Sequence, residues 1–199
     1  MESLRRAVLL SGGVDSICLT YNLRPDIAYT INYGQIPAQR EIYVSAFICE
    51  KLGIEHRILN VDCSEIGSGN LVNKESTKNS PSEEWWPYRN QLLITLALMD
   101  AIKKDVSELH IASVKSDSFH RDGTSKFYKL MNDLSEYQEA GIKIICKTTE
   151  FYSHELVQQF NVPSEYILMA HSCHVSNIAC GRCSGCLKQI RVRQEVDLE

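Results

Sequence analysis

Residues 7–23 predict a buried strand, a tight turn and a helix in immediate succession. Ala7–Leu10 are apolar and run without a gap into Ser11–Ser16, whose sequence is Ser-Gly-Gly-Val-Asp-Ser. The two glycines let the backbone adopt positive φ and approach a ligand closely. The amides of the turn and of the helix start then point to one place, where the helix dipole favours negative charge. The turn therefore predicts a binding site for a phosphate or pyrophosphate group.

Other phosphate motifs do not fit this loop. No Gly-Lys-Ser/Thr follows the glycines, and the third glycine of a dinucleotide fingerprint is missing. The loop resembles the pyrophosphate loop of the N-type ATP pyrophosphatases, which split ATP between the α- and β-phosphates. The alternative is a glycine turn that only joins a strand to a helix. The resemblance implies that pyrophosphate contacts Leu10, Ser11, Gly12, Gly13, Val14, Asp15 and Ser16.

Short apolar runs alternate with amphipathic stretches along the chain, which is typical of a parallel α/β sheet. We expect a doubly wound, Rossmann-like sheet of the adenine-nucleotide-hydrolase type, with the ligand at the carboxyl ends of the strands. Polar residues 61–84 predict a surface loop or flap. The expected domains are residues 1–165 and a small zinc-binding appendage at 166–199. The predicted strands are 7–10, 27–32, 56–60, 108–113 and 142–145, and the predicted helices are 14–23, 37–52, 89–104 and 124–139.

Length and charge exclude several classes of protein. The 199 residues suffice for one well-buried domain with a small appendage. The formal net charge is −4 and there is no long basic run, so the charge pattern of a nucleic-acid-binding protein is absent. Lys188, Arg191 and Arg193 form the one basic cluster, which we interpret as a solvated helix face. No stretch predicts a signal peptide or a membrane span, so we expect a cytoplasmic protein.

Four of the eight cysteines stand close together near the C-terminus, at Cys173, Cys180, Cys183 and Cys186. Four thiolates at such short spacings suit a closed tetrahedral Zn²⁺ site. An iron–sulfur cluster uses similar spacings, and two disulfides are the third alternative. His171 and His174 flank the first cysteine and could replace it as ligands. Because four thiolates already complete a site, we expect both histidines to lie outside the ligand set.

The remaining cysteines show no mutual spacing pattern. Cys18 and Cys49 fall in predicted helices and are interpreted as small buried hydrophobic residues. Cys63 and Cys146 fall in or beside the expected ligand loops. No neighbouring base supports either of them as a nucleophile.

The loop and the cysteine set together resemble the 7-cyano-7-deazaguanine synthase family over nearly the whole chain. Tyr33-Gly34-Gln35 matches the family's Tyr-Gly-Gln, and Pro87-Tyr88-Arg89-Asn90 matches its Pro-Gly-Arg-Asn. Cys180-Gly-Arg-Cys183-Ser-Gly-Cys186 matches its Cys-Gly-x-Cys-x-x-Cys. Asp117 and Asp122 fall in the loop where the family has acidic residues near the substrate.

This resemblance implies an ATP-dependent reaction in two stages. ATP adenylates the carboxylate of a 7-carboxy-7-deazaguanine and releases pyrophosphate, and ammonia then displaces AMP to give an amide. A second activation dehydrates the amide to a nitrile. The implied cofactors are ATP, Mg²⁺ and Zn²⁺, and family members are often homodimers. A small-molecule substrate is expected, and neither a membrane nor a nucleic acid is.

Each implied role has a structural alternative. Asp15, with Ser16, would serve catalysis by orienting Mg²⁺, or Asp15 would only satisfy amides of the first helical turn. Arg89 would bind a phosphate or carboxylate, or lie on the surface. Asn90 would contact the heterocycle or cap a helix. The expected substrate contacts are Tyr33, Gln35, Arg89, Asn90, Asp117 and Asp122, and Trp85 and Trp86 would stack on a base or form an oligomer contact.

The chain departs from the family pattern on the acceptor side. Asn32 replaces an aspartate, Tyr88 replaces a glycine, and Ser153 stands where the family has a lysine at the start of a late helix. The loop 114–123 is shorter than usual. Two alternatives therefore stay open. One is activation of this or another acid for a different amine, for example on a protein. The other is a non-catalytic nucleotide-binding subunit.

Overall fold

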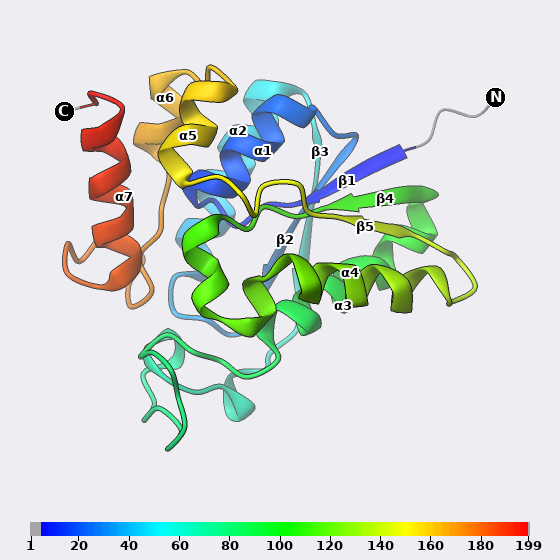
Figure 1. Ribbon diagram of the computed structural model, residues 1–199, viewed down its shortest axis with the longest axis horizontal. Coiled ribbons are helices and arrows are strands. Elements are labelled where there is room, and N and C mark those ends of the chain that lie inside the picture. The colour runs from blue at the N-terminus through cyan, green and yellow to red at the C-terminus, as the bar shows by residue number, and fades with distance from the viewer. Residues whose placement is uncertain (1–4, 199) are drawn as a thin grey trace.

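A parallel five-stranded sheet with helices on both faces forms the centre of the protein (Figure 1). The computed structural model describes residues 5–198. The strand order is β3-β2-β1-β4-β5, and every neighbouring pair is parallel. This order reverses direction at β1, as in doubly wound nucleotide-binding folds. The predicted fold class is confirmed.

All five predicted strands are present, with ends shifted by a few residues. The largest shift is at the end of β4, which was predicted to reach residue 113. Ser113 instead bonds to a side chain, since its amide donates to Thr148 Oγ1 at 3.1 Å and its carbonyl accepts from the same hydroxyl at 2.8 Å. The strands are β1 (Arg5–Leu9), β2 (Ile27–Asn32), β3 (Glu55–Asn60), β4 (Val106–His110) and β5 (Lys143–Ile145).

The four predicted helices are also present, and three more follow β5. Pro37 caps α2 and does not lie inside its first turn, and a 3₁₀ turn at Ile102–Lys104 continues α3. The sequence pattern did not predict α6, and it indicated α7 only through the basic helix face of Lys188, Arg191 and Arg193. The helices are α1 (Val14–Leu23), α2 (Ala38–Leu52), α3 (Arg89–Ala101), α4 (Ser125–Glu136), α5 (Ser153–Gln159), α6 (Ser164–Met169) and α7 (Ser184–Glu195).

Alternate residues of the central strands are buried in two separate hydrophobic cores, one on each face of the sheet. Val8 and Ala28 pack in the core under α1, α2, α5 and α6, whereas Ala7 and Ile27 pack in the core under α3 and α4 (Figure 1). Both faces of the sheet are thus apolar, as the near-continuous hydrophobic runs of the strands predict. Val192 of α7 belongs to the first core.

The expected division at residue 165 falls inside α6, which spans Ser164–Met169. Through Val192, the C-terminal segment also packs on the core of the sheet. The division into 1–165 and 166–199 therefore stays a prediction. Within residues 5–198 there is no helix of the length and apolarity that crossing a bilayer requires.

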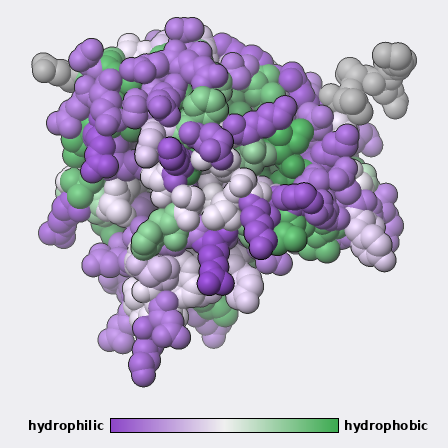
Figure 2. Space-filling model, in the orientation of Figure 1, coloured by the Kyte–Doolittle hydropathy of each residue, from purple (hydrophilic) through white to green (hydrophobic). Residues whose placement is uncertain are grey.

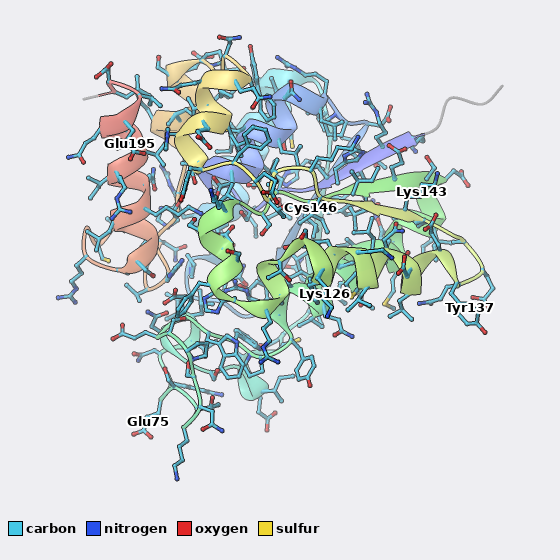
Figure 3. All side chains as sticks on the ribbon, in the orientation of Figure 1. Glu75, Lys126, Tyr137, Lys143, Cys146 and Glu195 are labelled. Atoms are coloured by element: carbon cyan, nitrogen blue, oxygen red, sulfur yellow. The ribbon has the colours of Figure 1, made fainter. Side chains whose placement is uncertain are left out.

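Residues 61–88 project from the sheet at the bottom of Figure 1, with Glu75 near the tip in Figure 3. The tip is hydrophilic in Figure 2. The segment contains short 3₁₀ turns at Ser64–Ile66 and Asn70–Val72. Trp86, which was expected to stack on a base or form an oligomer contact, is only 3% exposed.

Trp86 anchors this loop to the core. Its ring meets that of Tyr33 edge-on, with centroids 5.0 Å apart, and lies against Gly67, where even a Cβ atom would come within 2.8 Å of the ring. We expect Trp86→Ala to lower the free energy of unfolding by about 3–5 kcal/mol, as truncation of a buried aromatic ring does. Trp85→Ala, at the adjacent half-buried position, is the matched control. Denaturant unfolding measures both, and equal losses would contradict the assignment.

Candidate active site and cysteine cluster

The loop after β1 is held in shape by its own serines. Ser16 Oγ accepts from the Ser11 amide at 3.2 Å, lies 3.1 Å from Ser11 Oγ and donates to the Gly13 carbonyl at 3.0 Å. Gly12 has a φ of +74°, in the left-handed region that glycine adopts without strain. The turn that the sequence predicts is therefore present at the start of α1.

A cavity of about 520 Å³ opens beside this loop. It lies at the carboxyl ends of β1 and β4, where the strand order reverses, which is the usual ligand position in such sheets. Its volume lies within the range of small-molecule sites. Most of the predicted site residues line it, namely Leu10, Ser11, Gly13, Val14, Asp15, Ser16, Tyr33, Arg89, Asn90, Asp117 and Asp122.

Gln35 does not line the cavity, and its polar atoms are bonded within the protein. Its Oε1 accepts from the Tyr33 amide at 2.8 Å, and its Nε2 donates to the Ile31 carbonyl at 3.0 Å and to Glu41 Oε2 at 2.8 Å. The side chain is 3% exposed. The prediction that Gln35 contacts the substrate is corrected accordingly: its side-chain amide fixes the backbone at the end of β2.

Arg89 enters the cavity from the first turn of α3 beside Tyr33, Glu41 and Asp122. Burial would lower the pKa of Arg89, but the charges of Tyr33 and Asp122 raise it. Burial raises the pKa of Glu41 to about 7, against the opposing effects of Gln35 and Arg89. Arg89 is therefore a charged group inside the cavity and not an ordinary surface arginine.

Asn90 holds the neighbouring loop in place. Its Nδ2 donates to the Asp122 carbonyl at 2.9 Å, so one end of its amide is bonded to the protein. The preceding Tyr88 has a φ of +59° and is 77% exposed. A glycine adopts that backbone conformation readily. Tyr88 therefore holds a left-handed backbone conformation that a glycine at this position would adopt without strain.

Lys188 was missed as a site residue. It was interpreted as part of a solvated face, but its Nζ lies in the cavity and donates to Asp15 Oδ2 at 2.8 Å and to Asp117 Oδ1 at 3.1 Å. Burial would lower the pKa of Lys188, but both carboxylates raise it. Asp117 also accepts from the Val114 amide at 3.0 Å through its other oxygen. Lys188 therefore connects the two acidic residues across the cavity.

Asp15 has the properties of a residue that could hold a divalent cation. Its Oδ1 is buried without a hydrogen-bond partner among residues 5–198, while Oδ2 pairs with Lys188. A buried carboxylate oxygen that no donor satisfies is costly unless a cation or water reaches it. Carboxylate oxygens are the ligands that Mg²⁺ prefers. The residues present therefore fit the expected Mg²⁺.

The four C-terminal cysteines gather at one point, with their Sγ atoms within 4.8 Å of one another. Cys180 and Cys186 Sγ, like Cys183 and Cys173 Sγ, are 3.9 Å apart. Zn–S bonds of about 2.3 Å in a tetrahedron separate sulfurs by about 3.8 Å. The backbone amides of Arg182 and Cys183 lower the pKa of Cys180 to about 6, which favours the thiolate. The cluster is therefore compatible with zinc.

Both flanking histidines lie outside this set of four sulfurs. His171 is 5% exposed, and its Nε2 lies 2.9 Å from the Ser176 carbonyl. His174 donates its amide to Cys183 Sγ at 3.5 Å, and its ring Nδ1 lies 3.3 Å from Ser184 Oγ. Both line the cavity, so this segment forms one of its walls.

Cys146 lies where β5 ends, near the middle of the molecule (Figure 3). It is half-buried, and burial raises its pKa. Burial also raises the pKa of Cys49 to about 12. A raised pKa disfavours the thiolate, which is the nucleophilic form. Neither thiol has the properties of a nucleophile.

Fold and cavity define a doubly wound α/β protein with a glycine loop at the switch point and a cysteine cluster beside it. The sequence profile of the family described as "Queuosine biosynthesis protein QueC" matches residues 5–196. The chain belongs to this family.

Curated relatives align over nearly their full lengths. The 7-cyano-7-deazaguanine synthase of Methanosarcina mazei is 26% identical, with 98% of this chain and 96% of the relative covered. The proteins of that name from Methanosarcina barkeri and Methanocaldococcus jannaschii are 29% and 27% identical, each with 94% of this chain covered and with 93% and 94% of the relative covered.

Loss of one cysteine should remove the metal. We expect Cys183→Ser to lose most of its bound zinc and to melt at a lower temperature, because a structural zinc site contributes folding free energy. A chain of this size loses about 2–4 °C for each kcal/mol. Metal analysis and thermal unfolding measure this, with Cys63→Ser as the control. Full zinc content in Cys183→Ser would contradict the assignment.

Glu41 should make stability depend on pH. Its pKa rises from 4.5 in the unfolded chain to about 7 in the folded one, so the folded state binds more protons between these values. The contribution of Glu41 to the free energy of unfolding is then fully present below about pH 4.5, is lost as pH rises from 4.5 to 7, and changes little above that. In Glu41→Gln this loss should be absent. Denaturant unfolding of both proteins from pH 5 to 7.5 isolates the effect, and parallel curves would exclude it.

Proposed function

We propose that this chain is an ATP-dependent, AMP-forming ligase. It adenylates the carboxylate of 7-carboxy-7-deazaguanine and combines it with ammonia to give 7-cyano-7-deazaguanine. Membership of the queuosine biosynthesis family and the names of the relatives support the product. The observation that carries the ATP half is that loop 11–16 and Arg89 line one cavity at the switch point.

The first half-reaction makes a leaving group. A carboxylate oxygen attacks the α-phosphorus of ATP, the bond to the bridging oxygen of the β-phosphate breaks, and pyrophosphate leaves. The amides and hydroxyls of Ser11–Ser16 receive the pyrophosphate, and Arg89 binds a phosphate or the carboxylate through its planar fork. Asp15 would hold Mg²⁺, which would supply positive charge to offset that of the phosphates.

The second half-reaction forms the C–N bond. Ammonia attacks the carbonyl carbon of the acyl adenylate, AMP leaves with its phosphate oxygen, and one proton is released to give the amide. For the nitrile, the amide oxygen attacks the α-phosphorus of a second ATP and displaces pyrophosphate. AMP then leaves as the nitrogen loses its two protons. Substrate contacts from Tyr33, Asn90, Asp117 and Asp122 belong to this proposal, as do the bound zinc, a homodimer and a cytoplasmic location.

The test is AMP formation from ATP with 7-carboxy-7-deazaguanine and ammonium, with the product analysed by mass spectrometry. We expect AMP, pyrophosphate and the nitrile, each dependent on the acid. AMP without a nitrile would favour an activated acid passed to a different amine, for example on a protein. If zinc-loaded protein forms no AMP with this acid, the proposed ligase is excluded.

Asp15→Asn should lower the rate of AMP formation about 100-fold or more, because it removes a charge at the leaving pyrophosphate. Zinc content and far-UV circular dichroism should match those of the unchanged protein. Asp26→Asn, at a carboxylate that bonds the Arg6 amide far from the cavity, is the control. A turnover near normal in Asp15→Asn would refute the role given to Asp15.

A further inference from the structure

The ion pairs of Lys188 join the two ends of the chain. Lys188 lies in α7 and Asp15 in the first turn of α1, 173 residues apart, with their charged atoms 2.8 Å from each other. The Lys188 side chain is 34% exposed, so the ammonium faces the cavity and not the core. A basic side chain thus borders the loop that is proposed to receive pyrophosphate.

The segment before α7 fixes this position. The His171 amide donates to the Gly12 carbonyl at 2.9 Å, which joins the segment to the loop itself. The Ser172 amide donates to Gln189 Oε1 at 3.1 Å, which joins it to α7. Gly185 lies so close to the Ser172 carbonyl that no Cβ atom fits between them. These contacts hold the start of α7 against the loop.

The cysteine cluster adds a second constraint on the same helix. Cys183 caps α7 and Cys186 lies in its first turn, two residues before Lys188. Four ligands on one ion fix the relative positions of their backbones. The direction in which Lys188 enters the cavity is therefore set by the cysteine cluster together with the Gly12 contact.

Lys188 retains hydrogen-bonding capacity at the loop. A lysine ammonium has three N–H donors. Within residues 5–198 it donates to two acceptors, on Asp15 and Asp117. Its third donor is available to a ligand in the cavity.

Few basic side chains of residues 5–198 line the cavity, so this free donor could contribute to anion binding. Of the described residues that line it, five are carboxylates and two, Arg89 and Lys188, are lysine or arginine. Loop 11–16 contains no basic residue. A polyphosphate brings further negative charge, which basic groups and bound cations must offset.

We propose that Lys188 binds the phosphate groups of the ligand on loop 11–16. The ammonium keeps its contact with Asp15 and donates its remaining hydrogen to a phosphate oxygen. The C-terminal helix then supplies a basic group that the loop lacks, and the cysteine cluster positions it. This inference rests on the proposed function only in that it assumes a phosphate ligand.

The test is calorimetric binding of pyrophosphate in the presence of Mg²⁺ to the zinc-loaded, full-length protein. We expect Lys188→Met to weaken binding about 10- to 100-fold, since a hydrogen bond between charged groups contributes about 1.5–3 kcal/mol. Lys188→Arg should bind within a few-fold of the unchanged protein. Arg191→Met is the matched control, because Arg191 lies exposed on the same helix and its loss removes the same charge.

Zinc content and melting temperature are measured for each variant. Unchanged pyrophosphate affinity in Lys188→Met would overturn the proposal and leave Lys188 as a structural ion pair. If Lys188→Met loses zinc, the proposal is tested instead by amine labelling of the unchanged protein, with the labelled lysines identified by mass spectrometry. Pyrophosphate should protect Lys188 and leave exposed Lys129 reactive, and equal labelling of Lys188 with and without pyrophosphate would overturn the proposal.

Failure of the two proposals can be told apart. Pyrophosphate binding needs neither the acid nor the amine. A protein that binds pyrophosphate through Lys188 but forms no AMP would exclude the proposed ligase and support the role of Lys188. If the protein forms AMP but Lys188→Met keeps an unchanged affinity for pyrophosphate, the proposed ligase is supported and the proposed role of Lys188 is excluded.

Discussion

The packing around Gly12 is the constraint on which the site depends. A Cβ atom at this position would lie 3.0 Å from the Glu41 carbonyl oxygen and 3.2 Å from Val44 Cβ, so α2 approaches the loop as closely as its backbone allows. The Gly12 carbonyl also accepts the His171 amide of the C-terminal segment. Three stretches of chain thus meet at one residue with positive φ. A side chain there would strain the turn and separate α2 from it, so the shape of loop 11–16 and the attachment of the cysteine segment depend on the same residue.

Signals that are local in sequence predicted most of the fold. The apolar strands, the glycine turn and the helices over 14–23 and 37–52 each depend on residues close together in the chain. The buried face of α7 could not be predicted in this way, because the helix reverses the usual pattern of buried apolar and exposed polar residues. It buries Gln189 and Cys186, whereas Leu187 and Ile190 are 49% and 42% exposed. Its orientation depends on the cysteine cluster and on the contacts of Ser172, so periodicity gave no indication that Lys188 faces the cavity. The loop residues and the four cysteines were found because each set is contiguous or closely spaced.

Residues near a site can match a family motif and still serve the scaffold. In Tyr33-Gly34-Gln35, the φ of Gly34 is +96° and the amide of Gln35 bonds to three protein groups. Tyr33 in turn packs on Trp86, which fixes the loop that precedes Arg89. This motif therefore positions Arg89 as much as it offers contacts of its own. A sequence can place an amide side chain near the expected site. It does not show whether the hydrogen-bonding atoms of that side chain are already bonded to neighbouring backbone groups.

The charges of the cavity restrict what the proposed ligase can accept. Arg89 and Lys188 face five carboxylates among the described lining residues, so a free polyphosphate would enter a site that is already acidic. Two changes reduce the repulsion. Glu41, with a pKa of about 7, can remain partly protonated near neutral pH, and a divalent cation can bind the buried Asp15 oxygen that lacks a partner. Protonation of Glu41 offsets at most one charge, and an ATP molecule carries about four near neutral pH, since the last phosphate ionises with a pKa of about 6, as in other phosphate monoesters. For the proposed ligase, these charges therefore favour a metal-bound nucleotide over the free one. They also make the proposed role of Lys188 more important, because loop 11–16 has no basic residue of its own.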